Sequence, residues 1–265
     1  MSQTKNVIET ARRLYRNRYA GKKIPVTVGC PSKYANTLTN LKEGGIAIIE
    51  NYFTREQCQE ICQAIDKVFD KKTDDFLREN RVNQPNNGWE TEYGYRIWAD
   101  KNFSDKRIPK SEKIHPLIKI FFDDDDLWTL GKVFLGFEFN KNNCQAGRTI
   151  FMQNNLGSGG GWHRDQSYRR GYKAMAYLTD VNEDNGPFQY IKNSSDLSHH
   201  LLKTPFPDKY QYTEEEIMKI IDGNSMKITT NTAKAGTVIV FDTNAIHRGK
   251  PLNQGTRYAL TNYYN

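Results

Sequence analysis

Two histidines and one aspartate have the residue types and spacing of a metal site. His163 and Asp165 are separated by one residue. If that segment is extended, both side chains point to the same face, with Cα atoms roughly 6–7 Å apart. His247 follows residues 236–242, an apolar run that predicts a strand ending in a turn. Two imidazoles and one carboxylate can occupy one face of an octahedral metal and leave the other positions open, a pattern typical of non-haem Fe(II) oxygenases.

A His-x-Asp pair alone is a weak signal, but two further features support a metal site. Arg257 lies ten residues after His247, on the next predicted strand. Its guanidinium could hold the distal carboxylate of a dicarboxylate through two parallel hydrogen bonds. The long segment between Asp165 and His247 contains several predicted strands. This is expected if the ligands lie on opposite sheets of one barrel.

The elements that must position these residues change in character along the chain. Helical patterns dominate the first half, at residues 4–19 and from Thr54 onward, with a strand at 45–50 between them. Residues 71–115 are polar and irregular. The four aspartates at 123–126 precede an apolar helical pattern, and we interpret them as helix-capping residues.

Short strands and turns follow from about residue 144. The predicted strands are 147–153, 173–179, 187–191, 226–230, 236–242 and 256–264. Because βαβ alternation is absent from the pattern, we expect one α+β domain over residues 1–265. Its helical part is about 1–143, and an antiparallel sandwich or barrel covers about 144–265.

Composition narrows the class of protein. The 265 residues carry 38 Lys and Arg against 31 Asp and Glu, a net charge of +7. This excess permits nucleic acid as a partner, but an anionic small substrate explains it equally well. The sequence shows no membrane span and no secretory signal. Cys58 and Cys62 are interpreted as core residues of a helix, and a cytoplasmic location is the default expectation.

Several segments resemble the phytanoyl-CoA dioxygenase family of Fe(II)/2-oxoglutarate oxygenases. The residues that carry the resemblance are Trp-His-Arg-Asp at 162–165, Asn-Gly-Pro-Phe at 185–188, GTVIVFDTNAIHRG at 236–249, TRYALT at 256–261 and the N-terminal run 44–53. The resemblance covers roughly residues 33–265 and is strongest after 160. It implies a double-stranded β-helix, a jelly-roll or cupin-like core, with N-terminal helices.

The same resemblance implies roles for individual residues. His163, Asp165 and His247 would hold Fe(II), Arg257 would hold the co-substrate 2-oxoglutarate, and O2 would be the second co-substrate. A carboxylate at Asp165 favours hydroxylation or another oxidation over halogenation, because related halogenases have a small residue there. Gln153, and Thr149 four residues before it, are further candidates for the 2-oxoglutarate site.

Candidate substrate contacts are basic or aromatic. Arg169, Arg170 and Lys173 follow Asp165 closely and could meet an anionic substrate at the cavity mouth, whereas the alternative leaves them facing solvent. Trp98 lies in the aromatic segment 86–103, which together with residues 192–225 is a candidate lid. His199 and His200 are interpreted as loop residues.

The predicted function is that of an Fe(II)- and 2-oxoglutarate-dependent dioxygenase. We expect it to hydroxylate, or otherwise oxidise, a C–H bond of a small molecule, with an anionic one favoured. Two alternatives stay open from the sequence. One is the same chemistry on a glycan, a lipid or nucleic acid, and the other is a non-catalytic binding protein of this fold.

Overall fold

A computed structural model describes residues 28–69, 89–90, 96–100, 103–165, 171–195, 211–224 and 226–264. Several predictions fall on residues outside these ranges. They are the helix at 4–19, the side chains of Arg169, Arg170, His199 and His200, and parts of the two candidate lids. Within the described ranges, every helix is too short or too polar to cross a bilayer.

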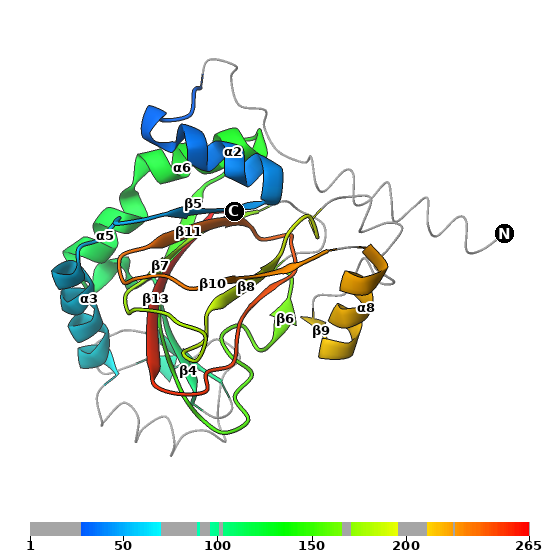
Figure 1. The fold of residues 1–265 in the computed structure, drawn as a ribbon. Helices are drawn as coiled ribbons and strands as arrows, with labels where there is room; N and C mark the ends of the chain where they lie inside the picture. Colours follow the sequence, from blue (N-terminus) through cyan, green and yellow to red (C-terminus); the bar gives the residue numbers. More distant parts are fainter. Residues whose placement is uncertain are drawn as a thin grey trace.

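Two antiparallel sheets form the core of the molecule (Figure 1). The larger runs in the spatial order β1 (Ile46–Ile49), β11 (Val238–Asp242), β7 (Tyr172–Tyr177), β13 (Thr256–Tyr264), β5 (Lys141–Ile150), β4 (Asp105–Pro109), β3 (Arg96–Ala99) and β2 (Trp89–Glu90). The smaller runs in the order β10 (Ile228–Asn231), β8 (Phe188–Ile191), β12 (His247–Gly249), β6 (Trp162–His163) and β9 (Gln211–Tyr212). This pair of sheets confirms the predicted α+β jelly-roll fold.

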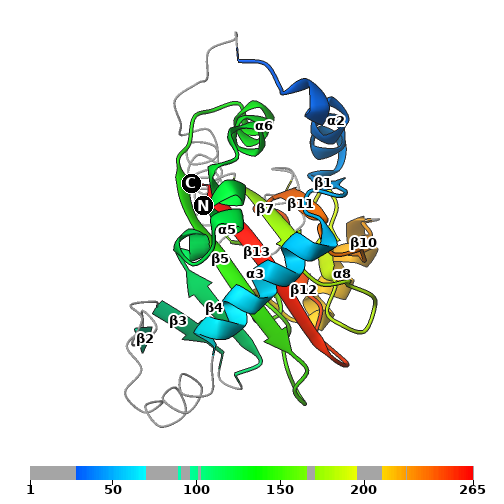
Figure 2. The ribbon, with the colours of Figure 1, turned by 90° about the vertical axis from the view of Figure 1, so that its left-hand side faces the viewer.

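Helices cover the larger sheet on the side away from the smaller one. Figure 2 shows α3 running diagonally across this outer face. The helices and short 3-10 turns of the described chain are η1 (Ser32–Tyr34), α2 (Ala35–Gly44), α3 (Arg55–Val68), η3 (Ser111–Lys113), α5 (Pro116–Asp123), α6 (Asp125–Leu135) and α8 (Glu214–Asn224). Of these, α8 lies beside the smaller sheet (Figure 1). The main hydrophobic cluster packs α2, α3, α5 and α6 on the larger sheet, which stiffens the scaffold of the site.

Local sequence signals start the helices as expected. Thr54 accepts a hydrogen bond from the Gln57 amide at 3.2 Å, and the Gln57 side chain accepts one from the Thr54 amide, which completes a capping box at the start of α3. Asp124 accepts from the Leu127 amide at 2.9 Å and starts α6. The interpretation of the aspartate run as a helix start is therefore confirmed.

We expect Thr54→Ala to lower the free energy of unfolding by about 1 kcal/mol, because α3 then loses the side-chain acceptor at its first turn. Urea unfolding followed by circular dichroism measures the change. Thr54→Ser retains the acceptor and serves as the control. Equal stability of the alanine variant and the wild type would contradict the role of the cap.

The prediction that residues 71–115 are irregular was wrong for the second part of this segment. Both β3 and β4 lie there and extend the larger sheet. The sequence of β4, Asp-Lys-Arg-Ile-Pro, reads as polar because Asp105 and Arg107 point into a polar cavity instead of an apolar core. Strand β1 likewise joins the larger sheet by pairing with β11, so strands of the core come from both sides of residue 144.

Candidate active site

The structure brings His163, Asp165 and His247 together at one end of the smaller sheet. One potential ligand atom of each residue lies within 4.8 Å of those of the other two. The Nε2 atoms of His163 and His247 lie 3.8 and 3.7 Å from the two carboxylate oxygens of Asp165. The two histidines are direct partners across β6 and β12, so the pairing of two strands alone fixes their separation. This donor set fits a divalent metal that prefers nitrogen and oxygen ligands.

Backbone carbonyl groups orient both imidazoles. The Nδ1 atom of His163 lies 2.8 Å from the carbonyl oxygen of Gly161, and Nδ1 of His247 lies 2.8 Å from that of Ala245. A carbonyl can only accept a hydrogen bond, so each Nδ1 carries the proton and each Nε2 presents its lone pair toward Asp165. Burial lowers the pKa of both histidines, to about 3 for His247, and so favours the neutral form that a metal requires.

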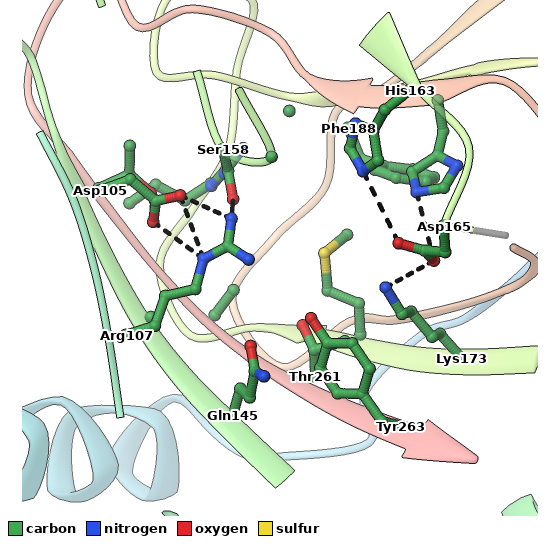
Figure 3. Close-up of a pocket in the computed structure, with 18 of the residues that line it drawn as sticks. Asp105, Arg107, Gln145, Ser158, His163, Asp165, Lys173, Phe188, Thr261 and Tyr263 are labelled. Atoms are coloured by element: carbon green, nitrogen blue, oxygen red, sulfur yellow. Dashed lines mark hydrogen bonds and ion pairs between the residues drawn. The ribbon is translucent and has the colours of Figure 1, made fainter. Parts of the chain in front are cut away.

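Asp165 is held ionised by Lys173. Burial alone would raise the pKa of Asp165, but the Lys173 ammonium, with Nζ 2.6 Å from Oδ2, lowers it to about 2. Burial opposes the charge on Lys173, and Asp165 outweighs it, so the pKa of Lys173 is raised. Figure 3 shows Lys173 and His163 converging on the Asp165 carboxylate. The carboxylate is thus charged and positioned for a metal.

A second functional group lies at the other end of the same cavity. Arg257 is 4% exposed, its Nε has no hydrogen-bond partner, and no carboxylate in the described chain forms an ion pair with its guanidinium. Burial lowers its pKa as a result. A buried cation without a counter-ion is costly, so this site is arranged to receive an anion.

Together these groups line one open cavity between the two sheets (Figure 3). Its empty volume is about 700 Å³, counted with the open mouth. Apolar walls come from Met175, Phe188 and Phe241, and the rings of Phe188 and Phe241 lie next to that of His247. The cavity therefore combines a metal-ligand triad, a site for an anion and an apolar lining.

Of the two further residues predicted for the 2-oxoglutarate site, Thr149 lines the cavity and Gln153 does not. Thr149 lies in the cavity wall directly opposite Arg257 in the β5–β13 pairing. Gln153 does not, because β5 ends at Ile150 and Gln153 is exposed in the following turn, outside the cavity lining. The strand predicted from the sequence ends at residue 153, three residues after the observed end of β5, so Gln153 falls outside the site. The amide that does line the cavity is Gln145, eight residues earlier.

The predicted substrate residues also divide. Lys173 is buried inside the cavity and does not rim its mouth. Trp98 is 41% exposed on β3, outside the cavity lining, and its ring lies 5.2 Å from the guanidinium carbon of Arg107. Arg169 and Arg170 lie outside the described residues.

A polar group on the larger sheet was not predicted from the sequence. Arg107 binds the carboxylate of Asp105 at 2.6 Å and the hydroxyl of Ser158 at 3.0 Å, and Gln145, Thr261 and Tyr263 line the cavity nearby. The alternation of Thr261 and Tyr263 with Arg257 along one strand was a signal that could have identified these two. Nothing comparable marks Asp105 and Arg107.

The absence of a side chain at Gly159, in the loop before β6, leaves room for the His163 ring. A Cβ on Gly159, where φ is +91°, would lie 2.3 Å from the Cε1 atom of His163. We expect Gly159→Ala to displace the ring and weaken metal binding by about 10–100-fold, the loss typical when the support of a ligand is removed. Isothermal calorimetry with Co(II) measures the affinity.

Gly160 provides a matched control for that variant. It also has a positive φ, +73°, but a Cβ there would meet only the Nε2 atom of Gln211, at an ordinary distance of 3.9 Å. Gly160→Ala therefore adds the same kind of backbone strain without the contact on His163. If both variants lose the same affinity, the contact with the ring is not the cause.

Comparison with known proteins agrees with this site. A family model for phytanoyl-CoA dioxygenase matches residues 41–259. The chain belongs to the phytanoyl-CoA dioxygenase family, as the sequence resemblance predicted. No curated protein sequence matches it.

Solved structures of low sequence identity share the fold. The non-heme alpha-ketoglutarate-dependent carbocyclase SnoK from nogalamycin biosynthesis matches with a TM-score of 0.61 and 13% identity, over 89% of this chain and 86% of that chain. EctD from S. alaskensis with bound Fe matches with a TM-score of 0.60 and 17% identity, over 92% and 82%. HygX from Streptomyces hygroscopicus, with nickel, 2-oxoglutarate and hygromycin B bound, matches with a TM-score of 0.57 and 13% identity, over 87% and 86%.

Family and site together define the class of enzyme. The chain is a 2-oxoglutarate-dependent non-haem iron dioxygenase, with Fe(II) as cofactor and 2-oxoglutarate and O2 as co-substrates. The two-histidine, one-aspartate set and the unpaired buried arginine are the residues that such a cofactor and a dicarboxylate would require.

Proposed function

We propose that this enzyme oxidises a C–H bond of a small anionic molecule, with hydroxylation as the outcome. His163, Asp165 and His247 hold the iron, and Arg257 holds the distal carboxylate of 2-oxoglutarate, with Thr149 beside it. The observation that carries the proposal is the buried, unpaired guanidinium of Arg257 in the same cavity as the metal-ligand triad.

The bound groups supply the oxidising chemistry, in which 2-oxoglutarate is decarboxylated to succinate and one oxygen atom of O2 reaches the substrate. The residues of the chain bind and orient. Arg257 fixes one end of the co-substrate through its planar fork of donors. Met175, Phe188 and Phe241 limit water around the histidines, which strengthens each charged contact inside the cavity.

The preference for an anionic substrate follows from the charges that line the cavity. Arg107 is neutralised by Asp105, whereas Lys173 and Arg257 add positive charge. Once a divalent metal shares the charge of Asp165, the ammonium of Lys173 is no longer balanced by that carboxylate alone. A substrate with a negative group would restore the balance.

A screen of metabolite pools for succinate release tests this function. Purified protein with Fe(II), ascorbate and 2-oxoglutarate is expected to release succinate above background with at least one pool of small acids. An Asp165→Ala variant is the control, since it lacks the carboxylate ligand. Stimulation only by a glycan, lipid or nucleic acid would reject the small-molecule substrate, and no succinate release at all would favour a binding protein.

The cellular setting is also part of the proposal. All four cysteines are unpaired thiols, and burial raises the pKa of Cys58 to about 11 and those of Cys62 and Cys144 to about 12. Unpaired thiols and an Fe(II) cofactor both suit a reducing compartment, so we propose the cytoplasm.

A further inference from the structure

The strand pairing arranges the inward side chains of the larger sheet into four successive rows. Alternate residues of a strand share one face, and paired residues lie side by side. From one end of the cavity to the other, the first row is Asp105, Thr149 and Arg257, and the second row is Arg107, Gly147, Ala259 and Tyr177. The third row is Gln145, Thr261 and Met175, and the fourth row is Tyr263, Lys173 and Phe241. Most of these residues line the cavity.

The first two rows suit the co-substrate. Arg257 supplies the anion site in the first row, and Gly147 and Ala259 are the small residues of the second. A Cβ on Gly147 would find its nearest neighbour at 3.8 Å, so this part of the floor is open. A dicarboxylate held at Arg257 therefore has room to extend over the second row.

The metal ligands lie between the two ends of these rows. Gly249, two residues beyond His247, lies beside Arg257 of the first row. A Cβ on Gly249 would be 2.9 Å from the Nη2 atom of Arg257. Asp165 contacts Lys173 in the fourth row. The fourth row is thus next to the triad at the end of the sheet away from Arg257, and the third row adjoins it, so a second molecule bound there can reach the same metal.

The third and fourth rows carry hydrogen-bonding groups that the co-substrate does not use. Gln145, Thr261 and Tyr263 present an amide, a hydroxyl and a phenol to the cavity, and none of the three side chains has a hydrogen-bond partner among the described residues. In the view of Figure 3, Gln145 lies below Arg107, and Thr261 and Tyr263 lie between Gln145 and Lys173. Polar groups that face a cavity without partners provide direct contacts for a polar ligand.

Lys173 provides the charge at this end. Its ammonium contacts Asp165, and its Nζ lies 4.1 Å from the centroid of the Tyr263 ring. An ammonium has three donors, so one remains for a ligand after the carboxylate and the ring face are engaged. In the loaded site, the divalent metal, Arg257 and Lys173 carry four positive charges, whereas Asp165 and 2-oxoglutarate carry three negative ones. One positive charge remains, at the Lys173 end.

We propose that the third and fourth rows form the primary-substrate subsite and that Lys173 binds a single carboxylate of the substrate. Gln145, Thr261 and Tyr263 hydrogen-bond to a hydroxyl or amide group close to that carboxylate. The substrate is therefore a monocarboxylic acid with a neighbouring polar group. This inference rests on the proposed function, because it takes the first two rows as the 2-oxoglutarate site.

Anaerobic titration of the full chain tests the subsite. The protein is loaded with Fe(II) and 2-oxoglutarate, whose complex has a visible charge-transfer band, and the band is followed on addition of 3-hydroxybutyrate or butyrate at constant ionic strength. The corresponding primary amides, which have the same shape without the charge, are the matched probes. We expect both acids to bind at least tenfold more tightly than their amides, and 3-hydroxybutyrate more tightly than butyrate.

Variants assign the preference to residues. Lys173→Met is expected to abolish the tenfold preference for acid over amide, whereas Thr261→Val and Gln145→Leu reduce only the advantage of 3-hydroxybutyrate, by a few-fold. Lys219→Met, at an exposed lysine of α8, is the control. If Lys173→Met no longer forms the band, the comparison of acid with amide in the wild type, in Thr261→Val and in Gln145→Leu decides whether the subsite assignment holds.

The outcomes separate this inference from the proposed function. If the band does not form in the wild type, the metal and co-substrate sites are wrong and the inference fails with them. If the band forms but acids and amides bind equally, or Lys173→Met retains the preference, the subsite assignment is overturned while the proposed function stands.

Discussion

Iron binding and turnover are expected to be lost together when His247 is replaced by alanine. In the proposed metal site His247 supplies one of three ligands, and it is 3% exposed with its Nδ1 fixed by the Ala245 carbonyl, so no other described side chain can take its place. Loss of a group that merely orients a ligand costs about 10–100-fold in metal affinity, and loss of the ligand itself should exceed that. Calorimetry with Fe(II) under anaerobic conditions and succinate release measure the two effects.

A matched control separates the loss of a ligand from general damage. His115 caps the start of α5 by accepting a hydrogen bond from the Leu117 amide at 3.3 Å, far from the triad in the sequence. His115→Asn keeps a capping acceptor and should leave iron affinity unchanged. His163→Ala should behave like His247→Ala. Normal iron affinity in both triad variants would refute the ligand assignment.

Residue type and spacing were sufficient to predict which four residues of the candidate site lie together. His163 and Asp165 are two positions apart, a spacing that in an extended segment brings both side chains to one face regardless of the rest of the fold. His247 and Arg257 could be predicted because each lies at or near the end of an apolar strand with an unmistakable pattern. The structure brings all four to one cavity, as those patterns predicted.

The residues that the sequence did not reveal depend on strand pairing. Arg107 reaches the cavity because β4 pairs with β5. The five residues of β4 include three charged ones, so the strand lacks the alternating apolar pattern from which it could be predicted. Lys173 was expected at the cavity mouth because it follows Asp165 closely in the sequence. It lies inside because β7 is a central strand whose two faces are both buried.

The end of β5 illustrates the same limit for the co-substrate site. Gln153 was a reasonable candidate as long as the strand continued to that residue. The ladder between β5 and β13 ends at the Ile150–Thr256 pair, and the chain then turns away from the cavity. The ends of a strand are set by its partner, which a single sequence does not specify.

Arg257→Lys is expected to raise the Michaelis constant for 2-oxoglutarate at least tenfold, which corresponds to about 1.4 kcal/mol. Lysine keeps the charge but replaces a planar fork of five donors with a point charge on a different stem, so two parallel hydrogen bonds to a carboxylate become one. Arg257→Met should cost more, about 2–5 kcal/mol, because the carboxylate would then be buried without a partner. Succinate formation at varied 2-oxoglutarate concentrations measures both.

The site makes this effect selective for the co-substrate. Arg257 belongs to the first row of the larger sheet and makes no contact with the metal ligands, so iron affinity measured without 2-oxoglutarate should change little in either variant. Arg55→Lys is the control, because Arg55 forms an exposed pair with Asp180 that contributes at most about 1 kcal/mol to stability. Arg257→Met removes the guanidinium completely. An unchanged Michaelis constant for 2-oxoglutarate in this variant would therefore show that the co-substrate is anchored elsewhere.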